Sequence, residues 1–155
     1  MKNFSYPIKK NKSSLKHPYA AIEHRVIDSP AFADLSHSSV RLMLIMVRQL
    51  TLTNNGQIQA TWSYCKPRGF GSENTLRAAI AELISHGFIY RTRSRGPNKV
   101  WAKYAVTWVS IVKKEGLFLD GFMHNAWQNW EKTPVKKCHI RPSKFVINSS
   151  ISIRN

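Results

Sequence analysis

Acidic residues are scarce in this chain. Only 8 Asp and Glu residues are set against 24 Lys and Arg, which gives a formal net charge of +16 and a sequence pI near 10.3. Such an imbalance favours a polyanionic partner, because each neutralised phosphate releases condensed counterions. Duplex DNA, ribosomal RNA and an anionic membrane surface all satisfy this requirement, and the rest of the sequence must separate them.

Cysteine is rare, and long apolar runs are missing. The two cysteines, Cys65 and Cys138, are too few for a disulfide framework, which fits a reducing compartment. No apolar run reaches the roughly 20 residues that a transmembrane helix needs, and no apolar stretch follows the first lysines as in a secretory signal. We therefore expect a cytoplasmic, nucleoid-associated protein with no membrane partner.

Residue patterns of common enzymes are also missing. No two histidines are separated by a single residue, as rolling-circle initiators require, and the adjacent Cys138 and His139 lack zinc-site spacing. No phosphate-loop or dinucleotide-binding glycine signature occurs. Asp28 and Asp34 could pair at a metal, but a turn and a helix cap explain them more simply. We expect no catalytic residue, no metal, no cofactor and no enzymatic activity.

The length and composition predict one α+β domain with appendages. The chain has 155 residues, of which 43% are hydrophobic and 11% aromatic, enough to bury a core. We predict a basic arm over residues 1–17, a main domain over 18–111, an aromatic helical extension over 112–131 and a basic tail over 132–155. The arm either follows a DNA backbone or is simply solvated.

The first half of the main domain predicts a central helix and a short strand. The apolar run within residues 20–27 fits an extended segment or a short helix. Ser36 is a good N-cap for a helix over 36–50, whose apolar residues cover more than one face. A turn at residues 53–56 precedes a plausible strand at 57–60, which we expect to pair with a later hairpin.

The segment 61–87 predicts a helix-turn-helix. A short polar segment over 61–66 leads into a glycine-punctuated turn and then a helix over 72–85, with Ser72 as N-cap and Gly87 as its C-terminal stop. One apolar stripe runs along this helix, formed by Leu76, Ala79, Ile80, Leu83 and Ile84. The remaining positions should point away from the core: Asn74, Arg77, Ala78 and Glu82.

The next segment predicts a β-hairpin. Residues 88–93 and 100–108 are rich in aromatic and β-branched residues, and the turn residues 96–98 lie between them. Arg91, Arg93 and Arg95 alternate, so a regular strand would place them on one face.

Candidate DNA contacts follow from this layout. The first residues of a helix that enters the major groove read base edges, and Asn and Arg pair bidentately with adenine and guanine. We expect Asn74 and Arg77 to contact bases. The residues expected to contact phosphates are Ser72, Thr75, Lys66 and Arg68. The hairpin over 91–103 would contact flanking phosphates or the minor groove through Arg93, Arg95, Asn98 and Lys99. Simple capping, solvated faces and edge charges are the alternative explanations for these residues.

The aromatic residues are interpreted mainly as packing mass. Core positions are the expectation for Trp62, Tyr64, Phe70, Trp101, Tyr104 and Trp108. In the extension, aromatic and small residues recur four apart, which suggests a short helix over 118–130. That helix would pack on the domain or form a homodimer interface through Phe118, Phe122, Trp127 and Trp130.

Residues 36–110 resemble the winged helix-turn-helix superfamily, a three-helix core with a β-hairpin wing. The likeness rests on Thr61-Trp62, Arg68-Gly69-Phe70, Ser72 with Thr75-Leu76, Ala79 with Glu82-Leu83, and Gly87-Phe88-Ile89. This pattern of residues is especially similar to small helix-turn-helix proteins of bacterial prophages and mobile elements. The resemblance implies DNA binding, with the helix over 72–85 in the major groove and the hairpin on the flanking backbone; it does not distinguish repression, activation, excision and replication initiation. Our hypothesis is a sequence-specific, double-stranded-DNA-binding protein that regulates transcription of a mobile element.

Three other functions remain open at this point. A plasmid or phage replication initiator, or an excision factor, would bind repeated DNA sites instead of a promoter. A protein-interaction module would act through the aromatic segment 118–130. An RNA-binding protein would need another surface, because the major groove of A-form RNA does not admit a helix.

Overall fold

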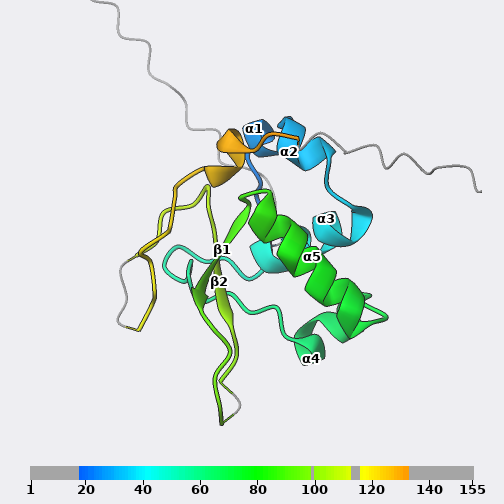
Figure 1. Cartoon of the computed structure of the whole chain (residues 1–155), viewed down its shortest axis with the longest axis vertical. Helices are drawn as coiled ribbons and strands as arrows, with labels where there is room; N and C mark the ends of the chain where they lie inside the picture. The colour runs from blue at the N-terminus through cyan, green and yellow to red at the C-terminus, as the bar shows by residue number, and fades with distance from the viewer. Residues whose placement is uncertain (1–17, 99, 113–115, 133–155) are drawn as a thin grey trace, which may run out of the picture.

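The computed structural model of the chain describes residues 18–98, 100–112 and 116–132, and within them the fold is mixed α+β. Helices precede a two-stranded antiparallel sheet (Figure 1). The elements are α1 (His24–Ile27), α2 (Pro30–Ala33), α3 (His37–Val47), α4 (Trp62–Cys65), the 3-10 helix η1 (Lys66–Arg68), α5 (Glu73–Ser85), β1 (Ile89–Arg93), β2 (Lys103–Val106) and the 3-10 helix η2 (Ala126–Asn129).

The two long helices begin where their serine caps predict. The Oγ of Ser36 accepts a hydrogen bond from the amide of Ser39 at 3.3 Å, and that of Ser72 from the amide of Asn74 at 3.2 Å. A capping oxygen satisfies an N–H group that has no carbonyl partner in the first turn. Helix α3 ends at Val47, three residues before the expected position, and the ambiguous run over 20–27 ends in the short helix α1.

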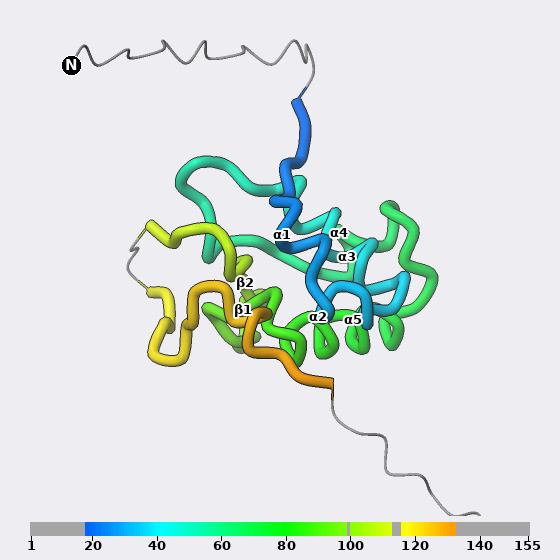
Figure 2. Tube along the Cα trace, turned by 90° about the horizontal axis from the view of Figure 1, so that it is seen from above, coloured from blue at the N-terminus to red at the C-terminus, as the bar shows by residue number. Residues whose placement is uncertain are grey.

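Helix α3 packs against α5, and the sheet closes the other side of the core. Figure 2 views this arrangement from above, with α3 and α5 on one side and the strands on the other. The largest side chains at the centre are fully buried and come from every layer: Phe88, Leu42, Met43, Met46, Ile58, Leu83 and Val26. These side chains belong to one continuous hydrophobic core.

Gly87 stops α5, as predicted, and it also allows a close approach of two chain segments. Its φ is +75°, in the left-handed region that favours glycine. A Cβ at this position would lie 2.6 Å from the backbone of both Ala126 and Trp127. The segment that contains η2 therefore passes directly over the end of α5.

The hairpin contains a β-bulge that the sequence does not predict. Arg91 pairs with Tyr104 and Arg93 with Lys103, so Thr92 is the extra residue. Thr92 is buried, its hydroxyl donates to the carbonyl of Gly56 at 2.6 Å, and its own carbonyl accepts from the amide of Phe118 at 2.8 Å. The bulge breaks the period-two alternation. The expectation that Arg91, Arg93 and Arg95 share one face is therefore wrong.

The predicted strand at 57–60 is reduced to a single bridge, but it pairs with the hairpin as expected. Ile58 and Tyr104 exchange two backbone hydrogen bonds, of 3.1 and 2.9 Å. The buried side chain of Asn55 continues this pairing toward the end of β2. It accepts from the amide of Val106 at 2.9 Å and donates to the carbonyls of Val106 and Val109. A side-chain amide thus occupies part of the edge where a third strand would pair.

The aromatic extension packs on its own domain without forming the expected helix over 118–130. Its described residues form turns and the single short helix η2. The expected helix is interrupted at Asn125, whose φ of +55° no α-helix accommodates. Trp127 nevertheless becomes part of the core, with its ring stacked 6.3 Å from that of Phe88.

Candidate nucleic-acid interface

The first turn of α5 is open to solvent. Glu73, Asn74 and Thr75 are all exposed, and the Ser72 hydroxyl occupies only one of the free amides. The remaining amides carry the positive end of the helix dipole and attract anions. This end of α5 can therefore accept a phosphate oxygen, while Asn74 and Arg77, one turn apart, project from the same exposed side.

Glu82 fixes the orientation of α5 against α3. Its carboxylate accepts from the amide of Ser36 at 2.7 Å and from the hydroxyls of Ser36 and Ser39 at 2.6 Å each. Burial raises the pKa of Glu82, but these hydrogen bonds outweigh burial, and the pKa lies below its usual value. The expectation that Glu82 points away from the core is wrong, because its partners lie more than 40 positions earlier in the chain.

The turn before α5 is held by two arginines. The Nη1 of Arg41 donates to the carbonyl of Gly69 at 2.9 Å, and Gly69 itself has a φ of +95°. The guanidinium of Arg68 lies 3.7 Å from the ring centre of Tyr64 and donates to the Tyr64 carbonyl at 2.5 Å. Arg68, which the sequence assigned to a phosphate, is engaged within the turn.

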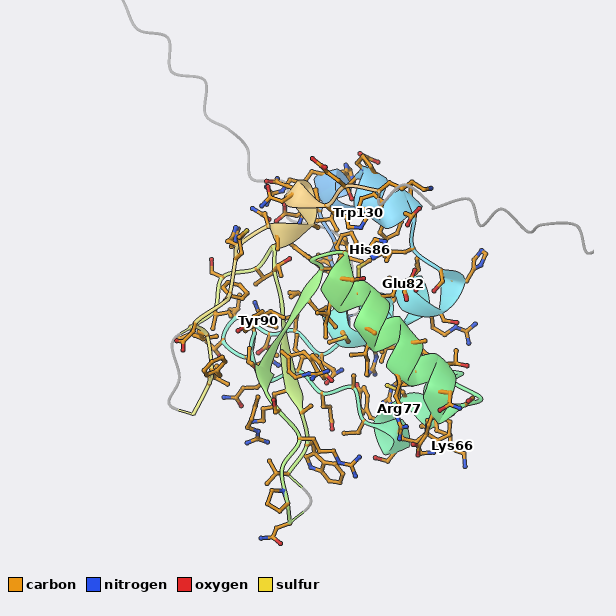
Figure 3. The ribbon with its side chains drawn as sticks, in the orientation of Figure 1. Lys66, Arg77, Glu82, His86, Tyr90 and Trp130 are labelled. Atoms are coloured by element: carbon orange, nitrogen blue, oxygen red, sulfur yellow. The ribbon has the colours of Figure 1, made fainter. Side chains whose placement is uncertain are left out.

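Lys66 lies at the same end of α5 as Arg77 (Figure 3). It is exposed, and its Nζ lies 6.0 Å from the ring centre of Trp62. At that distance a cation–π contact is weak, so the ammonium group can reach a backbone phosphate beside the helix.

A groove of about 750 Å³ separates α5 from the hairpin. We use "the groove" for the space bounded by α4, α5, β1 and the strand that follows the hairpin tip. Its lining combines apolar side chains with three arginines, and its residues are Ala60, Thr61, Trp62, Ser63, Glu73, Leu76, Arg77, Ile80, Ala81, Arg91, Arg95, Trp101, Ala102 and Tyr104.

The charge of the groove is positive, with one acidic exception. Arg77, Arg91 and Arg95 line it, against a single carboxylate among the lining residues, Glu73. Arg77 donates to Glu73 at 3.2 Å, and both side chains are at least half exposed. An exposed i,i+4 pair contributes only about 0.3–0.5 kcal/mol. A phosphate or a guanine can therefore displace Glu73 from Arg77 at small cost.

The two sides of the hairpin are joined at Trp101 by a side-chain contact. Arg93 donates from Nε and Nη2 to the Trp101 carbonyl, at 3.3 and 3.2 Å. Arg93, assigned to DNA by the sequence, thus braces the hairpin. Asn98 is exposed at the tip with a φ of +55°, and Lys99 lies outside the described residues.

The structure therefore divides the residues chosen from the sequence. It brings Arg77 and Arg95 together at the groove, whereas Asn74, Thr75 and Lys66 lie outside its lining. Among the lining residues that were not selected as contacts, Arg91 and Trp101 are the ones best suited to bind DNA. Arg91 belongs to the same alternating series as Arg93 and Arg95. The bulge breaks that alternation, and Arg91 and Arg95 line the groove whereas Arg93 does not. Trp101 was expected in the core.

A second cluster lies at the other end of α5 (Figure 3). His86 stacks on Trp130 with ring centres 4.8 Å apart, and its Nε2 lies 3.2 Å from Asp34. Lys132 donates to the other Asp34 oxygen at 2.8 Å. The hydrogen bond from Lys132, followed by that from His86, lowers the pKa of Asp34, and the same contact raises the pKa of Lys132. This cluster fastens residues 130–132 to the helical body.

The described residues contain no group of three or more metal-ligating side chains, and none of their helices has the length and apolar character needed to cross a membrane. Burial raises the pKa of the Cys65 thiol to about 11, which keeps it protonated and unreactive at neutral pH.

Comparisons with protein families, with curated proteins and with solved structures gave no match for this chain.

Proposed function

We propose that this protein is a winged helix-turn-helix protein that binds double-stranded DNA in a sequence-specific manner and regulates transcription of a mobile element. One observation carries the proposal. Arginines from α5 and from the hairpin line a single groove, beside the open N-terminus of the helix that would enter the major groove.

The order of elements supports this proposal. Helix α3, the bridge at Ile58, the short helix α4, helix α5 and the hairpin β1–β2 follow one another along the chain. In a winged helix the same order is helix, strand, helix, helix and wing, and the expected function follows from the resemblance noted in the sequence. The exposed hairpin extends away from α1 and α2 (Figure 1), as a wing must.

In this proposal α5 reads the major groove. Asn74 and Arg77 face the base edges, where an amide pairs with adenine and a guanidinium with guanine. Arg77 exchanges its partner Glu73 for the DNA, and Glu82 keeps the helix at a fixed angle to the body. Lys66 and the free amides of the first turn hold the adjacent phosphates.

The hairpin contributes the flanking contacts. Arg91 and Arg95 face the groove, so they reach the backbone on the side of the duplex next to α5. Arg68 and Arg93 act indirectly, because they hold the turn and the hairpin in place. If about six phosphates are neutralised per protomer, the logarithm of the affinity falls against the logarithm of the salt concentration with a slope of about −5.

The test is a selection from random duplex DNA at physiological salt, carried out in parallel with the wild type, Arg77→Ala and Arg25→Ala. Arg25 is a matched control, since it is also an exposed arginine paired with a glutamate, Glu23, but belongs to α1. We expect an enriched motif that Arg77→Ala weakens at one or two positions and Arg25→Ala leaves unchanged.

Each other result contradicts a defined part of the proposal. Binding without an enriched motif would remove sequence specificity and leave an architectural DNA-binding protein. A motif that survives Arg77→Ala would remove α5 from base reading. A motif located in origin or attachment-site repeats, and absent from promoters, would favour a replication initiator or an excision factor. No binding to duplex DNA at all would remove the proposal itself.

A further inference from the structure

Trp101 differs from every other tryptophan of the chain. Trp101 is exposed, with 51% of its surface accessible, whereas Trp108 and Trp127 are buried and Trp62 and Trp130 are mostly covered. Exposing an indole ring to water forgoes a large apolar contribution to stability. Within the described part of the chain Trp101 stacks on no other ring, so packing gives no account of its position.

The position of Trp101 is nevertheless well defined. The two hydrogen bonds from Arg93 hold its carbonyl across the hairpin. Its neighbours in the groove lining include Arg91 and Arg95, and the guanidinium of Arg91 lies 5.9 Å from the ring centre of Tyr104. The hairpin therefore presents one exposed aromatic side chain in a groove that Arg91 and Arg95 also line.

This combination fits a nucleobase next to its own phosphate backbone. An aromatic ring stacks on any base through its π face, and neighbouring cations hold the chain that carries the base. In an intact duplex both faces of each base are already stacked. The free energy needed to open a base step is similar in size to the free energy gained by stacking, so inserting an indole ring gives little net binding energy. Where a base is already unpaired, the stacking gain is kept.

We propose that Trp101 stacks on an unpaired base at the junction between a duplex and a single-stranded extension. The duplex occupies α5, with its backbone against Arg91 and Arg95, and the first unpaired base of the extension lies against Trp101. This inference rests on the proposed function, since it assumes that the duplex binds at α5. It adds the kind of DNA end or opening that the protein prefers.

The experiment compares two DNAs by fluorescence anisotropy at physiological salt. One is a blunt duplex, and the other is the same duplex with a short single-stranded extension. The proteins are the wild type, Trp101→Ala, Trp101→Phe and the control Phe118→Ala. Phe118 is 62% exposed and does not line the groove, so its removal matches the loss of an exposed aromatic ring.

We expect the wild type to bind the extended duplex about tenfold more tightly than the blunt one. Trp101→Ala should lose this preference with little change in affinity for the blunt duplex, Trp101→Phe should keep most of it, and Phe118→Ala should behave as the wild type. Quenching of tryptophan fluorescence by the extended duplex should be reduced in Trp101→Phe.

Two results overturn the inference and leave the proposed function standing. These are equal wild-type affinity for the two DNAs, or a preference that survives Trp101→Ala. Equal affinity for the isolated single strand would also overturn it, because the junction would then be irrelevant. If neither duplex binds, the proposed function fails as well, and the blunt duplex makes that failure recognisable.

Discussion

The two ends of this molecule use the same residue types in opposite ways. Around α1, α2 and η2, aromatic rings lie on one another: Trp127 stacks on Phe88, and Trp130 stacks on His86. At the hairpin Trp101 is half exposed, although its hydrogen-bonded backbone is just as well placed. Rings that pack on other rings stabilise the fold. A ring whose backbone is held in place but whose face is open to solvent is available to a ligand.

The charges repeat this contrast. At the α1 end Lys132 pairs with Asp34, and Arg25 pairs with Glu23. At the groove, Arg77, Arg91 and Arg95 share one acidic neighbour among the lining residues, Glu73. In a chain with so few acidic residues, where those residues lie decides where the surplus positive charge acts. Five measurements test how the two ends differ.

Removing a ring from each end should have the most unequal effect on stability. We expect Trp127→Ala to lower the free energy of unfolding by about 3–5 kcal/mol, because it leaves a cavity against Phe88. Trp101→Ala should change it by no more than about 0.5 kcal/mol, as for an exposed side chain. Urea unfolding followed by circular dichroism measures both. Similar losses for the two variants would mean that the hairpin ring is structural after all.

Removing an acidic group from each end of α5 should give the next largest difference. Glu82→Gln should lose about 1–3 kcal/mol of unfolding free energy, because three donors at the N-terminus of α3, from Ser36 and Ser39, lose a charged acceptor. The matched control Glu73→Gln should lose at most about 0.5 kcal/mol, since it breaks only an exposed pair. Unfolding at pH 7 measures this difference, and equal losses would contradict the role given to Glu82.

The same pair predicts a pH dependence with a defined sign. The pKa of Glu82 is lowered from its ordinary value of 4.5, so its contribution is complete above that pH and disappears as the pH falls through the lowered pKa of the folded state. The wild type should therefore lose stability on acidification below about pH 4.5, and Glu82→Gln should lose less. Part of the acid loss should remain, because the pKa of Asp34 is lowered too.

Single arginines at the two ends should differ in DNA binding by a smaller amount. Arg91→Ala and Arg95→Ala should each reduce the magnitude of the salt slope of affinity by about 1, as expected for one lost phosphate contact. Arg25→Ala, at the α1 end, should leave the slope unchanged. Titrations at several salt concentrations provide the test, and an unchanged slope in both hairpin variants would place the phosphates elsewhere.

The smallest effect concerns the buried thiol of Cys65, the last residue of α4. Because burial raises the pKa of Cys65 to about 11, the folded state resists ionising it, and stability falls only as the pH rises above the ordinary thiol value of 9.0. At pH 7 we expect a thiol reagent to modify Cys65 far more slowly in the native protein than in urea. Equal rates would show that the α4 region opens readily.

Local patterns predict the helices of this fold well. Ser72 and Gly87 mark the ends of α5 correctly because capping and a left-handed stop depend on neighbouring residues alone. The roles of Glu82 and Thr92 could not be predicted in this way, since their partners are contributed by distant segments. The bulge at Thr92 could not be predicted either. Because it changes the faces to which the neighbouring side chains point, the sequence wrongly favoured Arg93 as a DNA contact over Arg91.

The aromatic extension shows the limit of periodicity. Aromatic residues spaced four apart are compatible with a helix, but Asn125 adopts a left-handed backbone conformation. Trp127 reaches the core from the short 3-10 helix η2, and Phe118 stays exposed. Trp101 shows the opposite error, because a preference of tryptophan for the interior says nothing about one particular ring. Whether a ring is covered depends on what the tertiary fold places over it.

The contact of the η2 segment with Gly87 and Phe88 also has a consequence for synthesis on the ribosome. Phe88 leaves the exit tunnel well before Trp127, so the nascent chain can form α3, α5 and the hairpin while one face of the Phe88 ring is still uncovered. Folding is completed only when the later segment closes over the end of α5. During that interval the uncovered face is an attractive site for a molecular chaperone.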